Sequence, residues 1–63
     1  MKKYYYVNFE YSENVFCVNI AHAESAEAVE NHYSKYNWCY VQDADSQVVE
    51  TARRKHMPII EIE

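Results

Sequence analysis

Two stretches of alternating residues, on either side of a short polar break, constrain the fold of this chain more than any other feature. Residues 3–11 and 15–21 are both rich in Tyr, Phe, Val and other strand formers at alternating positions. Between them lies Ser12-Glu13-Asn14, which suits a hairpin loop with Asn14 as the left-handed residue. The chain contains no glycine, so its turns must use Asn, Asp and Ser. We therefore predict a β-hairpin at the start of the chain.

Alternation gives each strand of this predicted hairpin one strongly apolar face and one mixed face. In the first strand, one face carries Tyr5, Val7, Phe9 and Tyr11, and the other carries Tyr4, Tyr6, Asn8 and Glu10. In the second strand, one face carries Phe16, Val18 and Ile20, and the other carries Val15, Cys17, Asn19 and Ala21. We expect the strongly apolar faces to form the core. Tyr4, Tyr6 and Cys17 are then expected on the side away from it.

A first helix is predicted from Ser25 to about Tyr36. Ser25 is a suitable N-cap, and acidic residues on either side of it complement the positive end of a helix. The apolar residues that follow at helical spacing are Ala26, Val29, Tyr33 and Tyr36. Asn37 is expected to end the helix in place of glycine. Residues 38–42 then form a third strand.

A second helix is predicted after the turn Asp43-Ala44-Asp45-Ser46, which offers another N-cap. Its apolar side consists of Val48, Val49, Ala52 and either His56 or Met57. Three basic residues, 53–55, lie in its last turns, where cations suit the negative end of a helix. Pro58 ends the helix, because proline disfavours helical backbone in the residue before it. Residues 59–62 form a last short strand.

These elements predict one α+β domain over residues 1–63, in the order β-β-α-β-α-β. With helices this short, the economical arrangement is a two-layer sandwich: a four-stranded mixed sheet with both helices on one face. The last two strands should run parallel, because the helix between them makes a crossover connection. The second face of the sheet is then left without cover from this chain.

Composition limits the compartment and the kind of partner. The two cysteines are too few for a disulfide-stapled secreted protein, and no signal peptide or membrane span is visible. We therefore expect a cytoplasmic protein with reduced thiols. The net charge of −4 lacks the basic excess that is the first expectation for a nucleic-acid binder.

No constellation of residues predicts catalysis, a metal site or a cofactor. The candidate soft ligands and nucleophiles are Cys17, Cys39, His22, His32 and His56, and their spacing matches neither a zinc site nor a Cys–His arrangement. Asp43 and Asp45 fit helix capping better than a calcium loop, which needs more oxygen ligands and a glycine. The basic residues 53–55 fit the helix end better than a phosphate site. We predict that the protein is not an enzyme.

The aromatic residues on the uncovered sheet face are the most informative feature for function. Exposed aromatic patches mark protein interfaces, but they also stack nucleic-acid bases or simply widen a thin core. We predict that the protein binds a protein partner, or a second copy of itself in a homodimer. The predicted contact residues are Tyr4, Tyr6, Asn8, Asn19, Trp38 and Tyr40. The alternative is a single-stranded nucleic-acid binder that uses the same rings with Lys2, Lys3, Arg53 and Arg54. The acidic balance disfavours this alternative.

The stretch YYYVNFEYSENVFCVNIAHAESAEAVENHYSKY, followed by MPIIEIE, resembles small proteins carried on mobile and conjugative elements of Gram-positive bacteria. The shared features are a hairpin and the entry Ala23-Glu24-Ser25-Ala26 into a helix. This resemblance implies no catalytic residues and no cofactor. It implies a bacterial accessory protein that acts by binding.

Overall fold

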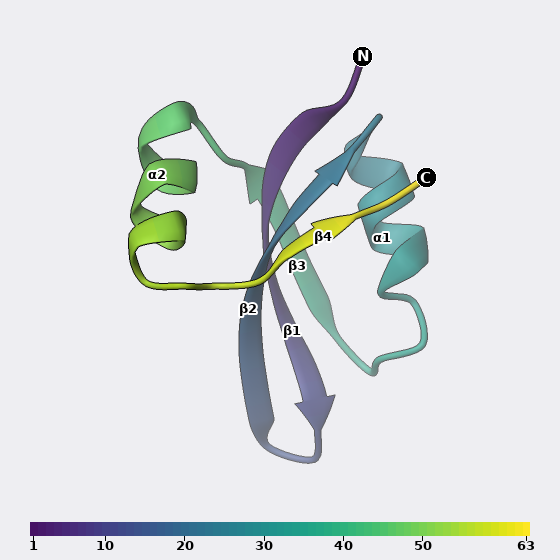
Figure 1. Ribbon diagram of the computed structural model, residues 1–63. Helices are drawn as coiled ribbons and strands as arrows, with labels where there is room; N and C mark the ends of the chain where they lie inside the picture. Colours follow the sequence, from purple (N-terminus) through teal and green to yellow (C-terminus); the bar gives the residue numbers. More distant parts are fainter.

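The computed structural model describes residues 1–63 and has the predicted order of elements (Figure 1). The elements are β1 Lys3–Ser12, β2 Val15–Ala23, α1 Ala26–His32, β3 Cys39–Asp43, α2 Ser46–Arg54 and β4 Ile59–Glu61. The hairpin prediction is confirmed, and Asn14 has the expected left-handed backbone with a φ of 60°. Neither helix is long and apolar enough to cross a membrane.

Side-chain caps begin both helices as the sequence predicted. The Ala28 N–H donates to Ser25 Oγ at 3.1 Å, and the Val48 N–H donates to Asp45 Oδ1 at 2.9 Å. The first helix is shorter than predicted, because it ends at His32. The Ser34 hydroxyl donates to the Asn31 carbonyl at 2.8 Å, and this local bond favours a turn over another turn of helix.

The four strands form one mixed sheet in the order β3-β1-β2-β4. β1 is antiparallel to both β2 and β3, whereas β2 and β4 are parallel. The predicted α+β class, the element order and the mixed four-stranded sheet are therefore confirmed. The strands β3 and β4 run in the same direction, as predicted, but they lie at opposite edges of the sheet.

The prediction that both helices pack on one face of the sheet is wrong. Figure 1 shows α1 and α2 on opposite sides of the strands, and each helix packs with a different hydrophobic cluster. The strand order explains this arrangement. The connection through α1 crosses from β2 towards one edge, and the connection through α2 crosses back to the other edge. Because both crossovers favour a right-handed sense, opposite directions of travel place the helices on opposite faces.

A bulge in the hairpin explains why both faces of the sheet carry apolar side chains. Beside the turn, Ser12 pairs with Val15, but the register shifts by one residue between Ser12 and Glu10. Without that shift, Phe9 would lie opposite Val18, and the strongly apolar faces of both strands would coincide. A slip of one residue sends every side chain of a strand to the other face. The bulge therefore puts the strongly apolar face of β1 and that of β2 on opposite sides of the sheet.

The observed register places residues of opposite character side by side. Tyr6 lies opposite Ile20, and Asn8 lies opposite Val18. Phe9 lies opposite Cys17, so Cys17 is on the α1 face, contrary to the prediction that it points away from the core. Tyr11, which was expected in the core, is 61% exposed next to the bulge.

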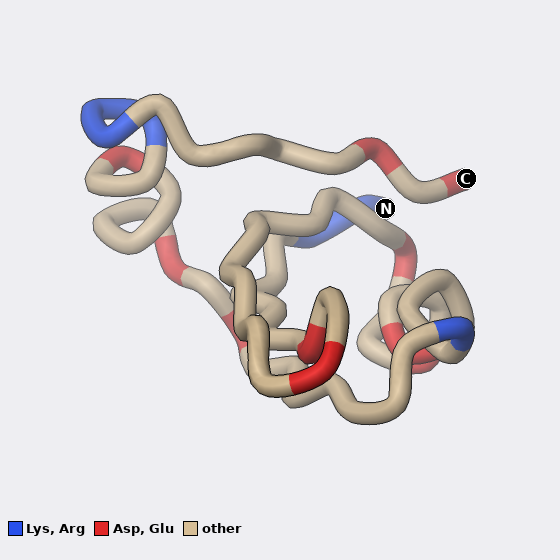
Figure 2. The backbone as a smooth tube through the Cα atoms, turned by 90° about the horizontal axis from the view of Figure 1, so that it is seen from below, with Lys and Arg blue, Asp and Glu red and all other residues tan.

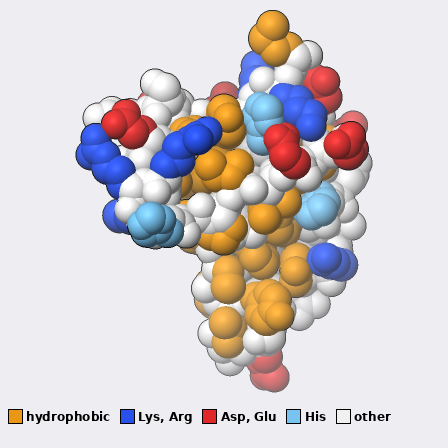
Figure 3. All heavy atoms as spheres, viewed as in Figure 1, with side chains coloured by type: hydrophobic (Ala, Val, Ile, Leu, Met, Phe, Trp, Pro, Cys, Tyr) orange, Lys and Arg blue, Asp and Glu red, His pale blue; other side chains and the backbone are white.

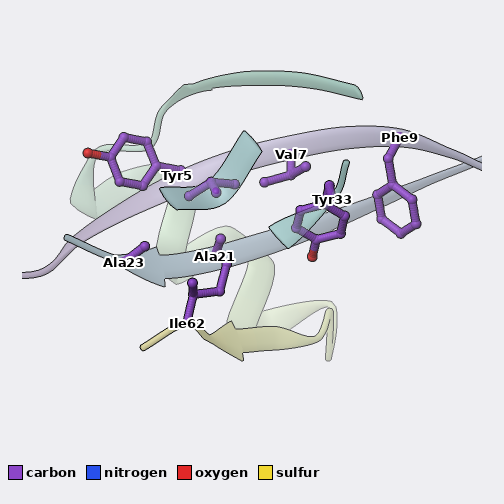
Figure 4. Packing of buried hydrophobic residues seen from close by; sticks show 8 residues of the cluster. Tyr5, Val7, Phe9, Ala21, Ala23, Tyr33 and Ile62 are labelled. Carbon is purple, nitrogen blue, oxygen red and sulfur yellow. The ribbon is translucent and has the colours of Figure 1, made fainter. Parts of the chain in front are cut away.

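The main core lies between the sheet and α1 (Figure 4). It consists of Tyr5, Val7, Phe9, Ala21, Ala23, Val29, Tyr33 and Ile62. A smaller core lies on the α2 face and consists of Ile20, Val49 and Ala52. Since this second core contains only three buried residues, α2 covers only part of its face.

Candidate protein-binding surface

The α2 helix covers one half of its sheet face and leaves the half nearest the hairpin turn bare. The chain enters α2 beside the start of β1, where the Ala44 N–H donates to the Tyr4 carbonyl at 3.0 Å. It re-enters the sheet where Ile59 pairs with Ile20, midway along β2. Beyond this point, Asn8, Phe16, Val18, Trp38 and Tyr40 lie on the uncovered part of the face; we call these five residues the open half-face.

Three rings give the open half-face its character. Phe16 is 59% exposed, Trp38 is 46% exposed and Tyr40 is 52% exposed. Phe16 and Trp38 meet edge to face across β1, with ring centroids 5.8 Å apart. Figure 3 shows hydrophobic side chains running from beside α2 down the hairpin. Phe16 and Trp38 thus form a packed aromatic pair on the surface, and Tyr40 is a third exposed ring on the same face.

The strand register holds these rings in place. Tyr40 lies opposite Asn8, and the Glu10 N–H donates to the Trp38 carbonyl at 3.0 Å. Phe16 lies opposite Glu10 on the other side of β1. The rings thus come from β2 and from β3 with the residue before it. They flank the central strand, whose side chains between them are polar.

Asn8 contributes an unusual polar group at the centre of this surface. Its side-chain oxygen is buried and has no hydrogen-bond partner. A buried acceptor without a partner costs about 1–3 kcal/mol relative to a satisfied one. This oxygen is covered by its own chain, so another molecule could reach it only after the Asn8 side chain rearranges. The site therefore combines apolar rings with one acceptor that is not satisfied within the chain.

A groove extends the open half-face beneath α2. It has a volume of about 370 Å³, and Tyr6 and Ile20 lie in it together with Val48 and Met57 of the α2 segment. Lys55 also lines this groove, at the end of α2 nearest the open half-face. The groove therefore lies beside α2, next to the open half-face along β1 and β2.

Charge is distributed unevenly around the open half-face. Figure 2, which looks from the hairpin end, shows acidic residues at the hairpin and basic residues on α2. Glu10 and Glu13 belong to the hairpin, and neither forms an ion pair within the chain. Lys55 also has no ion pair, whereas Arg54 is bound to Glu50 at 2.8 Å. The surface thus has an acidic end and a basic end.

The six predicted partner-binding residues fall in three different places. Asn8, Trp38 and Tyr40 belong to the open half-face. The expectation that Tyr4 and Tyr6 lie on an uncovered face is wrong, because both pack with the small core beside α2.

Tyr4 also has partners of its own within the chain. Its ring stacks on His22 with centroids 4.4 Å apart, and Arg53 Nη2 donates to its hydroxyl at 3.4 Å. Asn19 is on the α1 face, where its Nδ2 donates to the Tyr33 hydroxyl at 3.0 Å. Burial raises the pKa of Tyr33 above its ordinary value. The structure gives both Tyr4 and Asn19 a packing role.

Phe16 and Val18 belong to the open half-face, although alternation predicted that they lie in the core. Their apolar alternation with Ile20 suggested burial, and Ile20 is indeed fully buried. The exposure of Phe16 follows from the bulge and from the short reach of α2. The sequence carries no signal for this outcome, because the pairing of Phe16 with Glu10 and of Val18 with Asn8 depends on the bulge.

The other candidate chemical groups are dispersed. No cluster of three His, Cys, Asp or Glu side chains is placed to hold a metal ion. Cys17 and Cys39 are free thiols that lie opposite Phe9 on its two neighbouring strands. His22 lies 2.6 Å from the Glu61 carboxylate, which links β2 to β4. The two cysteines and His22 thus pair with neighbouring strands of the sheet, and the open half-face remains the main candidate site.

Comparison of the chain with protein-family models, with curated proteins and with solved structures finds no match. The resemblance to small proteins of mobile elements therefore stays a prediction.

Proposed function

We propose that this protein is a non-catalytic binding module, and that a protein partner docks on the open half-face. The observation that carries the proposal is the set of three exposed rings, Phe16, Trp38 and Tyr40, on one half of a sheet face. Tyr and Trp are enriched where proteins meet, because each ring contributes a large contact area with few rotatable bonds.

The arrangement supports a nucleic-acid partner less well. The basic residues Lys2 and Arg53 lie beside Glu61 and Tyr4, near the start of β1. The exposed rings lie near Glu10, six residues further along the strand, which corresponds to about 20 Å. A nucleic-acid surface needs cations that follow the backbone alongside the stacking rings. Here the hairpin next to the rings is acidic.

The test compares wild-type protein with the variant Trp38→Ser/Tyr40→Ser as immobilised bait. We expect wild type to retain a partner, including an untagged second copy of the chain, and the variant to lose it. Tyr11→Ser is the matched control, because Tyr11 is 61% exposed but lies at the bulge near Tyr36 on the α1 side. Circular dichroism checks that all three proteins are folded.

The control should behave as wild type. Equal retention by wild type and by the Trp38→Ser/Tyr40→Ser variant would contradict the proposal. The nucleic-acid alternative has a separate measurement: Trp38 is the only tryptophan, so its fluorescence reports on this surface directly. Quenching by a single-stranded oligonucleotide at low salt, reversed by added salt, would favour that alternative over a protein partner.

A further inference from the structure

We propose that the occupant of the open half-face is a second copy of this chain, packed face to face across a two-fold axis. This inference rests on the proposed function and specifies the partner. In the dimer, the hairpin of each copy covers the open half-face of the other. The axis lies across the strands, so the two hairpins point in opposite directions.

The space in front of the open half-face fits a second sheet. Packed sheets lie about 10 Å apart, which is close to the diameter of a helix with its side chains. The hairpin of the second copy would therefore occupy the same layer as α2 and would continue it. Its turn would abut the C-terminal end of α2, which ends beside the middle of the sheet (Figure 1).

Charge complementarity favours a second copy over an unrelated protein. The hairpin carries Glu10 and Glu13, and the end of α2 that it would meet carries Lys55. Because a two-fold interface uses the same contacts twice, the acidic hairpin of each copy meets the basic end of the other.

The contact area indicates a weak and reversible dimer. Each exposed ring is about half accessible, and a ring of this kind presents about 200 Å² when free, so three rings offer about 300 Å² per copy. Two copies then bury about 600 Å² through the rings alone, and contacts between the hairpin turns and the α2 ends add to this area. An interface dominated by this ring contact belongs to the small, weak class below about 1,200 Å².

The experiment is a charge swap read out by solution mass. Sedimentation equilibrium of the full chain at about 5 μM and about 500 μM should show monomer at the lower concentration and dimer at the higher one. Lys55→Glu and Glu13→Lys should each raise the dimer dissociation constant by about 5-fold or more, because each places like charges together. The combined variant Glu13→Lys/Lys55→Glu should recover most of the wild-type affinity.

A matched control changes the same charge on the other side of the molecule. Lys35→Glu lies next to Tyr36 on the α1 side and should leave the dissociation constant unchanged. The inference is overturned if wild type stays monomeric at the higher concentration, or if the combined variant is weaker than either single variant. Both outcomes differ from failure of the proposed function, which would appear as equal partner retention by the Trp38→Ser/Tyr40→Ser variant.

Discussion

The apolar faces of the two hairpin strands lie on opposite sides of the sheet, so residues that look alike in sequence should differ in how much they stabilise the fold. Phe16, Val18 and Ile20 alternate along β2 and look equivalent in sequence, but Ile20 is fully buried whereas Phe16 is 59% exposed. Ile20→Ala should therefore destabilise the fold strongly, and Phe16→Ala should have a small effect. The contrast tests whether α2 really covers only one half of its sheet face.

The magnitudes follow from burial. Ile20→Ala removes three buried carbon groups, worth about 0.8 kcal/mol each, and adds the cost of a cavity, so we expect a loss of about 3 kcal/mol. Phe16 keeps less than half of its side chain covered, so its truncation should cost about 1 kcal/mol or less. A chain of this size has a free energy of unfolding of about 3–9 kcal/mol, so the first loss is a large part of the total.

The assay is urea unfolding followed by circular dichroism, which avoids Trp38 because that ring contacts Phe16. Ile20→Val provides a milder version, with an expected loss of about 1 kcal/mol, in case Ile20→Ala does not fold. Equal losses for Ile20→Ala and Phe16→Ala would refute the reasoning. Such a result would mean that both residues share one closed core.

Three further predictions concern local interactions. The hydrogen bond from His22 holds the pKa of Glu61 below its ordinary value of 4.5, so this carboxylate stabilises the fold above pH 4.5 and loses that effect as the pH falls through its lowered pKa. When the pH is lowered from 6 to 3, the melting temperature of Glu61→Gln should therefore decrease less than that of wild type. Tyr33→Phe leaves the amide of Asn19 without its acceptor and should cost about 1 kcal/mol in urea unfolding, whereas no loss would show that water replaces the bond. Asp45→Ala removes the α2 cap and should also cost about 1 kcal/mol, and an unchanged stability would argue against the cap.

The sequence by itself determined the local elements of this protein. Alternation gave the hairpin strands, and the capping side chains of Ser25 and Asp45 marked the helix starts, because these signals act over a few neighbouring residues. Asn14 marked the turn for the same reason. Alternation also predicted that some aromatic rings lie outside the core, and Trp38 and Tyr40 are among the exposed rings of the open half-face.

Only the tertiary structure decided which faces these residues share. The bulge between Glu10 and Ser12 shifts the register by one residue, and the strand order sends the two crossovers in opposite directions. As a result, α2 covers Tyr4 and Tyr6, and Phe16 is left exposed beside Trp38. Alternation along a strand fixes which residues point the same way, but pairing between strands and the path of the chain fix what each face meets.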